Sequence, residues 1–346
     1  MATIQELKEL ALHSVRGTAP ANYTAETVDE ALRGEIATMC GSINNFNRNK
    51  YDIFEIIITA ADEVVPNKVI DAMGMFAEVK QVAQGQKAMF KRGLVGRNRA
   101  KKFLTQVAAS GVYETFRLDS DTFEVAARAI GGGASIDFER FLDGAESMSD
   151  LMDVITEGLV DAAYGEVQKC LIAAYEAVGR PEANTNAKNS ATVNKFDADE
   201  MVKLVNVVKA YGGNAAIFAA PEFISAMGPD AIVPVASNGN AGGVYHPQDI
   251  DAIHNYGYIN IFRGTPVIQL PQSFTDESNT ETVINPQYAY ILPTGKERVV
   301  KIVFEGETQV WDHVNRDQSI EIMAYKKMGA AILTHHNWAI YKNTSL

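Results

Sequence analysis

The stretch SMSDLMDVITEGLVDAAYGEVQKCLIAAYEAVG, residues 147–179, decides how the rest of the chain can fold. Its apolar residues recur at helical spacing throughout, and Ser147 with Asp150 has the spacing of a capping box, with Asp in place of the usual Glu. Gly179 is a favourable residue just past a helix end. About thirty residues at 1.5 Å each make a rod roughly 45 Å long. A helix of this length is typical of an element that spans a whole molecule.

After this helix the chain alternates between helix and strand patterns. Residues 180–194 are a polar link with one proline and four asparagines, which predicts a domain boundary. Residues 195–228 then predict helix, strand and helix. Two strands over 298–304 and 308–311 are predicted to form a hairpin that turns at Glu305-Gly306. Further strands are expected over residues 258–262, 266–270, 288–292, 319–324 and 330–333.

The N-terminal region predicts short helices joined by polar links, without a compact core of its own. Thr24–Met39 and Tyr51–Val65 have helical patterns, and Pro66 is expected to end the second helix. The asparagines in residues 44–49 predict a loop. Residues 1–68 are therefore expected to be an arm that packs on something else.

A segment of unusual charge lies between this region and the long helix. Residues 80–102 hold eight basic and no acidic residues, so the remainder of the chain carries a net charge of −20, against −12 for the whole. Its glycines predict turns, and thus a hairpin-like arm with a return strand over residues 103–115. The basic residues are Lys80, Lys87, Lys91, Arg92, Arg97, Arg99, Lys101 and Lys102.

This basic segment has three interpretations: a solvated charged hairpin, a nucleic-acid contact, or a contact with another copy of the chain. Nucleic-acid binding favours aromatic residues between the charges, and only Phe90 and Phe103 qualify. A strongly basic arm can neutralise an acidic neighbour in a repeated contact. The sequence therefore favours self-assembly.

Composition sets wider limits on the 346 residues. Apolar residues make up 47% and charged residues 21%, which excludes a disordered chain, a collagen-like repeat and a coiled-coil rod. An acidic chain is not a general DNA-binding protein by bulk charge. Two cysteines without a CxxC pair exclude a disulfide scaffold and a cysteine-based zinc site, and indicate a reducing cytoplasm. With neither a signal peptide nor an 18-residue apolar run, we expect a soluble protein.

Catalytic patterns are absent from the sequence. It has no Walker A sequence, GxGxxG or GxSxG elbow. Adjacent histidines point to opposite faces of a strand, so they do not share a metal easily. Cys40 has no predicted base beside it that would activate its thiol as a nucleophile. Cys170 lies in the apolar pattern of the long helix, which indicates a core residue. We therefore expect no catalytic residue, no cofactor and no metal. The histidines and cysteines considered as catalytic or metal-binding candidates are His246, His254, His335, His336, Cys40 and Cys170.

The order of these segments resembles the major capsid proteins of tailed bacteriophages, which have the Hong Kong 97-type fold. The resemblance covers roughly residues 70–345, and the order of its stretches is more specific than any one of them. The stretches are VAQGQKAMFKRG (82–93), the run TFRLDSDTFEV…GEV (115–167), YGGNAAIFAAPEFISAMG (211–228), FRGTPVIQLP (262–271), YAYILPTG (288–295), SIEIMAYKKMGAAIL (319–333) and NWAIYKN (337–343).

The resemblance implies an α+β fold with four parts after the family's plan. They are an N-terminal arm (1–68), a peripheral domain (69–193) with an extended loop (80–115) and a spine helix (149–178), an axial domain (194–293), and a return to the peripheral domain (294–346). Within the axial domain, residues 264–271 would form the crossing strand. The eight basic residues of residues 80–102 would then make intersubunit contacts through the extended loop.

The resemblance also implies a structural rather than enzymatic role. Copies would assemble as pentamers and hexamers of an icosahedral shell around double-stranded DNA, bound without sequence specificity. A separate scaffolding protein and a portal protein are the implied partners, assembly occurs in the host bacterial cytoplasm, and no membrane is involved. Covalent Lys–Asn cross-links are not expected.

Other interpretations stay open. An encapsulin shares the fold but packages a protein cargo. A soluble α/β enzyme would place a pocket in residues 195–292, and a nucleic-acid-binding protein would use residues 80–102.

Overall fold

The computed structural model describes residues 3–16, 18–20, 24–39, 41–92, 121–136, 148–176, 189–210, 214–228, 259–276, 278–295, 298–314, 320–332 and 338–346. Helices and strands are mixed along the chain, and the described strands form a four-stranded, a six-stranded and a two-stranded sheet. The predicted α+β class is therefore confirmed.

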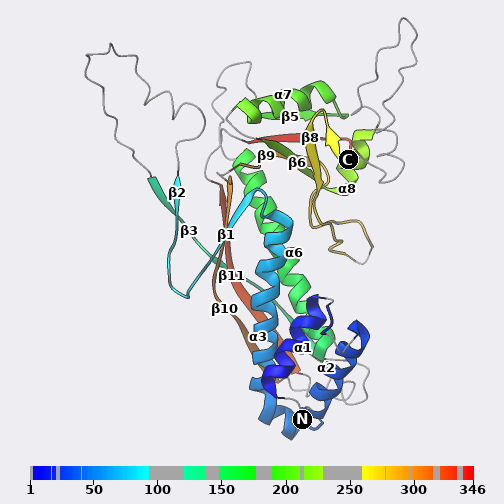
Figure 1. The fold of residues 1–346 in the computed structure, drawn as a ribbon, viewed down its shortest axis with the longest axis vertical. Coiled ribbons are helices and arrows are strands. Elements are labelled where there is room, and N and C mark those ends of the chain that lie inside the picture. Colours follow the sequence, from blue (N-terminus) through cyan, green and yellow to red (C-terminus); the bar gives the residue numbers. More distant parts are fainter. Residues whose placement is uncertain are drawn as a thin grey trace, which may run out of the picture.

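Two long helices run side by side along the longest axis of the molecule (Figure 1). The predicted long helix is confirmed as α6 (Met148–Glu176), and the second is α3 (Ile43–Met73). Helices α1 (Ile4–Arg16) and α2 (Ala25–Met39) pack beside them at the N-terminal end. Leu7, Ala11 and Leu32 are fully buried in the same core cluster as α3 and α6. The N-terminal helices thus contribute to the core of the body.

Helix α3 corrects two predictions. Its first turns contain the asparagines expected in a loop, because the hydroxyl of Ser42 accepts a hydrogen bond from the Asn45 N–H and caps the helix. Pro66 lies inside the helix and does not end it. A proline in a helix interior costs about 3 kcal/mol. Here Pro66 and its neighbours Val65 and Val69 are buried, so tertiary packing outweighs this local cost.

The four-stranded sheet carries the two long helices on one face. Its order is β1-β10-β11-β4, with β1 parallel to β10 and the other pairs antiparallel. Apolar side chains such as Ile302 and Ile322 point into the cluster shared with α3 and α6. The strands are β1 (Ala77–Val82), β4 (Arg128–Ile136), β10 (Val300–Val314) and β11 (Ile320–Ile332).

The hairpin predicted at Glu305-Gly306 is wrong. Strand β10 continues through these residues, and the register with β11 shifts between Glu305 and Gln309. Gly306 has a φ of 70°, which suits a bulge as well as a turn. The two strands predicted after residue 318 are likewise one strand, β11. A bulge and a tight turn use the same residue types, so local sequence does not separate them.

The six-stranded sheet has the order β5-β12-β9-β6-β8-β7. Helices α7 (Ala198–Ala210) and α8 (Pro221–Met227) flank β6, which confirms the predicted helix–strand–helix module. The C-terminal strand joins this sheet between β5 and β9. Its strands are β5 (Ser190–Val193), β6 (Ala215–Ala219), β7 (Ile261–Phe262), β8 (Thr265–Gln269), β9 (Tyr288–Pro293) and β12 (Ala339–Asn343).

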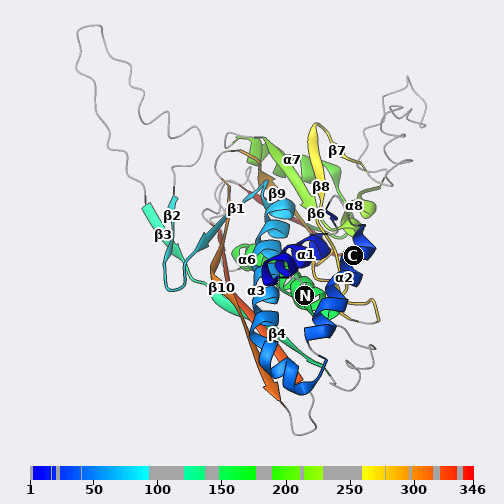
Figure 2. The same ribbon diagram turned by 60° about the horizontal axis from the view of Figure 1, so that its bottom comes forward.

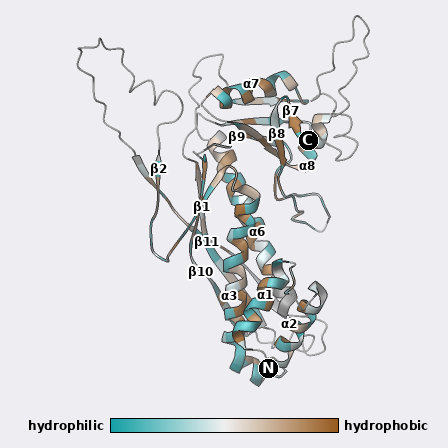
Figure 3. Cartoon of the chain, in the orientation of Figure 1, coloured by the Kyte–Doolittle hydropathy of each residue, from teal (hydrophilic) through white to brown (hydrophobic). Residues whose placement is uncertain are grey.

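One core joins the two larger sheets. Phe218 and Tyr290 of the six-stranded sheet belong to the same buried cluster as α3, α6 and β10. The rings of Phe76 and Phe218 lie 4.5 Å apart across this junction. A second cluster fills the other face of the six-stranded sheet under α7 and α8. Figure 3 shows brown, apolar strands around β9 with the partly teal helix α7 above them.

Candidate assembly surfaces

A two-stranded hairpin stands away from the body in two views (Figures 1 and 2). It consists of β2 (Ala88–Arg92) and β3 (Asp121–Val125), paired antiparallel. Its base is anchored, because Phe90 and Val125 are buried against Val303 of β10. The predicted return strand over residues 103–115 lies outside the described residues.

The first basic residues of the predicted segment are held at this base. The Lys80 ammonium lies 3.6 Å from Glu78 and 4.2 Å from the centre of the Phe90 ring, and donates to the Met89 carbonyl. Lys87 forms a 2.8 Å ion pair with Glu124 of β3. These contacts use part of the positive charge to fasten the hairpin.

A buried lysine also stabilises the base of the hairpin. Glu78 accepts a hydrogen bond from Lys301, whose side chain is almost fully buried. Burial by itself raises the pKa of Glu78, but the hydrogen bond and charge of Lys301, with the charge of Lys80, outweigh it and hold that pKa below its ordinary value. The base of the hairpin is therefore ionic at neutral pH.

Two more of the predicted contact residues lie on β2. Lys91 is exposed on β2, and Arg92 lies opposite Asp121 in the ladder. Arg97, Arg99, Lys101 and Lys102 lie outside the described residues. The structure thus brings Lys80, Lys87 and Lys91 together at the hairpin, with Lys91 nearest to the end of the described strand.

A polar network that the sequence analysis missed fastens α3 to the β10–β11 pair. The Asp62 carboxylate accepts hydrogen bonds from the Thr308 N–H at 2.8 Å, from the Thr308 hydroxyl at 2.5 Å and from the Lys326 ammonium. Nearer the N-terminal end of α3, Lys50 pairs with Asp312 at 2.9 Å, and this hydrogen bond raises the pKa of Lys50. Nothing in the local sequence pairs these residues, because they are more than 240 positions apart.

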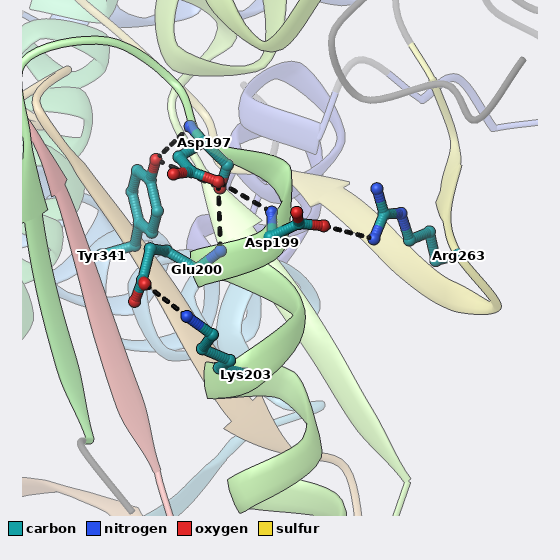
Figure 4. Close-up of polar contacts among 6 residues, drawn as sticks. All are labelled: Asp197, Asp199, Glu200, Lys203, Arg263 and Tyr341. Atoms are coloured by element: carbon teal, nitrogen blue, oxygen red, sulfur yellow. Dashed lines mark hydrogen bonds and ion pairs between the residues drawn. The ribbon is translucent and has the colours of Figure 1, made fainter. Parts of the chain in front are cut away.

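A second polar cluster surrounds the first turn of α7 (Figure 4). The Asp197 carboxylate caps the helix by accepting from the N–H groups of Asp199 and Glu200. The Tyr341 hydroxyl accepts from the Asp197 N–H at 2.6 Å, and burial raises the pKa of Tyr341 to about 12. Arg263, at the β7–β8 turn with a φ of 44°, pairs with Asp199 at 3.2 Å. The cluster ties helix, turn and C-terminal strand together.

The described residues offer no catalytic or metal arrangement. No group of three potential metal ligands occurs among them. Burial raises the pKa of the Cys170 thiol to about 11, so it is protonated at neutral pH. His246, His254, His335, His336 and Cys40 lie outside the described residues. Within the described ranges, no helix is both long and apolar enough to cross a membrane.

The chain matches one protein-family model over residues 4–339, described as "SPbeta prophage-derived putative capsid protein YonB". The match covers nearly the whole chain. The chain belongs to this family of capsid proteins. The predicted resemblance to tailed-phage capsid proteins is thereby confirmed, and with it a structural role in a virion capsid.

Solved structures similar to this capsid protein include capsid and encapsulin subunits. The capsid of an empty GTA particle is 14% identical, with 79% of this chain and 89% of that chain covered and a TM-score of 0.48. A phage-related protein from Bordetella bronchiseptica RB50 is 10% identical, with 84% and 97% covered and a TM-score of 0.47. The SrpI encapsulin from Synechococcus elongatus PCC 7942 is 13% identical, with 81% and 88% covered and a TM-score of 0.45. No curated protein matches the chain.

Proposed function

We propose that this capsid protein is the major shell-forming subunit of a phage particle with Hong Kong 97-type architecture. Copies assemble into pentamers and hexamers of an icosahedral shell that encloses double-stranded DNA. The observation that carries the proposal is the family match over residues 4–339, supported by the eight basic and no acidic residues of residues 80–102 in a chain whose net charge is −12. A cation-rich segment and an otherwise acidic chain are complementary between copies of the same chain.

We assign each of the two larger sheets to one domain of the subunit. The four-stranded sheet with α3 and α6 forms the peripheral part, with α6 as its spine. The six-stranded sheet with α7 and α8 forms the axial part, which gathers around the five-fold and six-fold centres. We keep the predicted boundaries at residues 193/194 and 293/294, with two exceptions. Strand β5, just before the first boundary, and strand β12, after the second, both lie in the six-stranded sheet.

We further propose the partners and place of assembly. A separate scaffolding protein and a portal protein act with the subunit in the cytoplasm of a bacterial host. The DNA contacts the inner surface without sequence specificity, and the subunit catalyses no reaction. An encapsulin is the alternative, and the contents of purified particles separate the two, because a phage shell holds DNA and an encapsulin holds a protein.

The role of the hairpin is tested by charge reversal. We expect a variant with four basic residues replaced by Glu to form no shells in negative-stain electron microscopy, while circular dichroism shows a folded subunit. The four residues are Lys91, Arg92, Arg97 and Arg99. Normal shells from this variant would refute the electrostatic role of the hairpin.

A smaller pair of variants controls for net charge. Lys91→Glu with Arg92→Glu changes the charge as much as Lys169→Glu with Lys203→Glu. The latter lysines are exposed on α6 and α7, and within the described residues their ion pairs are with Glu166 and Glu200 of their own helices. The hairpin pair is expected to reduce shell yield and the helix pair to leave it unchanged. An equal loss from both pairs would show that total charge matters and that the hairpin has no special role.

A further inference from the structure

Strand β4 lies at one end of the four-stranded sheet with one edge unpaired. It pairs with β11 over nine residues, from Arg128 opposite Met328 to Ile136 opposite Ile320. Among the described strands, no other pairs with β4. Gly131, Gly132 and Gly133 in its middle are all exposed. Within the described ranges, the backbone of this edge therefore has no strand beside it.

The residues of this edge lack the usual protection against pairing. Exposed edge strands are normally shielded by charges, prolines or bulges. In β4 the only charged residue is Arg128 at its beginning, and the other eight residues, 129–136, are uncharged and contain no proline. An edge of this length and composition favours addition of another strand.

The glycines hold a shallow trough open on the face of the sheet away from α3 and α6. A Cβ on Gly131 would lie 2.5 Å from the Cβ of Tyr325, and one on Gly133 would lie 3.0 Å from the Cγ of Met323. Side chains of β11 therefore occupy the space that side chains on β4 would need. A Cβ on Gly132 would meet nothing within 4 Å.

Large apolar side chains line the same trough. Trp311 is 51% exposed and Met323 is 41% exposed, and the rings of Trp311 and Tyr325 lie 4.9 Å apart. With the glycines of β4, these residues surround a hollow of about 710 Å³. Exposed aromatic and methionine side chains around a hollow are typical of a contact surface.

We propose that β4 pairs antiparallel with β4 of a second copy, about a two-fold axis at Gly132, so that two four-stranded sheets become one sheet of eight strands. The proposal rests on the self-assembly proposed above and adds the contact surface. In this register Gly131 lies opposite the partner's Gly133, and Arg128 lies opposite the partner's Ile136. Small residues thus meet small residues, and no like charges face each other.

This register also accounts for the glycines and the exposed aromatic residues. Directly opposite residues of an antiparallel pair lie on the same face, so Gly131, Gly133 and the partner's two equivalents form one continuous floor. The two β11 strands then stand three strand spacings apart, about 14 Å. Tyr325 and Met323 from each copy can lie across this floor and meet at the axis. A larger residue at position 131 or 133 would occupy that space.

Cysteine cross-linking tests the register in the full chain. Gly132→Cys places two thiols directly opposite each other at about 4.5–5.5 Å between Cα atoms, within the range of a disulfide. Ala129→Cys is the matched control on the same exposed strand, because the two thiols would be six residues apart along the pair, about 20 Å. Particles are oxidised with copper phenanthroline and separated on a non-reducing gel.

We expect the dimer fraction of Gly132→Cys to exceed that of Ala129→Cys and the parental chain by at least about tenfold, given the geometric limit on disulfides. The double variant Ala129→Cys with Ser135→Cys should also cross-link, because these positions face each other in the register. Particles that form normally without enhanced cross-linking in either variant would overturn the β4 pairing and leave the shell function standing. Failure of the parental chain to form particles when it is produced together with its scaffolding protein would instead refute the shell function and, with it, this pairing.

Like-charge substitution tests the same β4–β4 register without a cross-link. Gly132→Lys places two ammonium groups opposite each other, whereas Ala129→Lys places one opposite the partner's Ser135. We expect Gly132→Lys to reduce particle yield at least about fivefold relative to Ala129→Lys, since like charges directly opposite destabilise a strand pair. Both variants should retain the melting temperature of the parental subunit. Equal yields would overturn the proposed axis.

Discussion

Replacing Asp62 with Ala should strongly destabilise the subunit. Asp62 neutralises the Lys326 ammonium, whose side chain is only 4% exposed, and accepts from both the N–H and the hydroxyl of Thr308, which is 1% exposed. The variant leaves a buried cation and a buried N–H without this acceptor. Removal of one partner of a buried ion pair costs about 3–5 kcal/mol.

Removing the other partner should cost less. In Lys326→Met the Asp62 carboxylate keeps its two hydrogen bonds to Thr308 and is 24% exposed, so water can solvate it. A loss of about 1–3 kcal/mol is expected, in the range for an imperfectly satisfied polar group. In the double variant Asp62→Ala with Lys326→Met no buried charge remains. Its cost should fall short of the sum of the single variants by about 1–3 kcal/mol, as expected for residues in one network.

Urea denaturation of the unassembled full chain, followed by tryptophan fluorescence and circular dichroism, measures these differences. The free energy of unfolding is extrapolated to water for the parental chain and the three variants. A loss below about 1 kcal/mol for Asp62→Ala would refute the reasoning, because an average substitution already costs about 1 kcal/mol. Strict additivity in the double variant would show that the two charges do not depend on each other.

Three further outcomes are expected. Phe218→Ala should lower the free energy of unfolding by about 3–5 kcal/mol, because it empties a fully buried position where the two larger sheets meet; a cost near 1 kcal/mol in urea denaturation would contradict a shared core. Because the pKa of Glu78 is lowered in the folded chain, its stabilisation is present above its unfolded value of 4.5 and is lost as the pH falls through the folded pKa. The Glu78→Gln variant should therefore lose less stability than the parental chain between about pH 5 and pH 3. Parallel profiles of unfolding free energy against pH would count against an ionised Glu78 at the base of the hairpin. Cys170, with a pKa of about 11 against the ordinary 9.0, should be alkylated by iodoacetamide at pH 8 about 100-fold more slowly than in urea; equal rates by peptide mass spectrometry would show that burial does not control this thiol.

Elements that are set by local pattern were predictable from sequence. The helix over residues 148–176 has an apolar stripe along its whole length, and the helix–strand–helix module has a capping Asp197 and a proline at the start of α8. The charge asymmetry of residues 80–102 is likewise a property of composition alone. These features, in their order along the chain, carried the resemblance to capsid proteins.

Features that depend on distant residues were decided only by the tertiary structure. Pro66 remains inside α3 because the residues around it are buried by other elements, and Gly306 forms a bulge because β11 pairs on both sides of it. The bonds of Asp62 to Thr308 and Lys326 join residues that no sequence spacing connects. The glycine triplet was visible in the sequence, but its place on an open sheet edge beside Trp311 was not. The sequence determined the long helix α6, the helix–strand–helix module, the charges and the class of protein, because these depend on nearest neighbours and composition. The structure alone decided which surfaces are left to meet another copy, because exposure is a property of the packed chain.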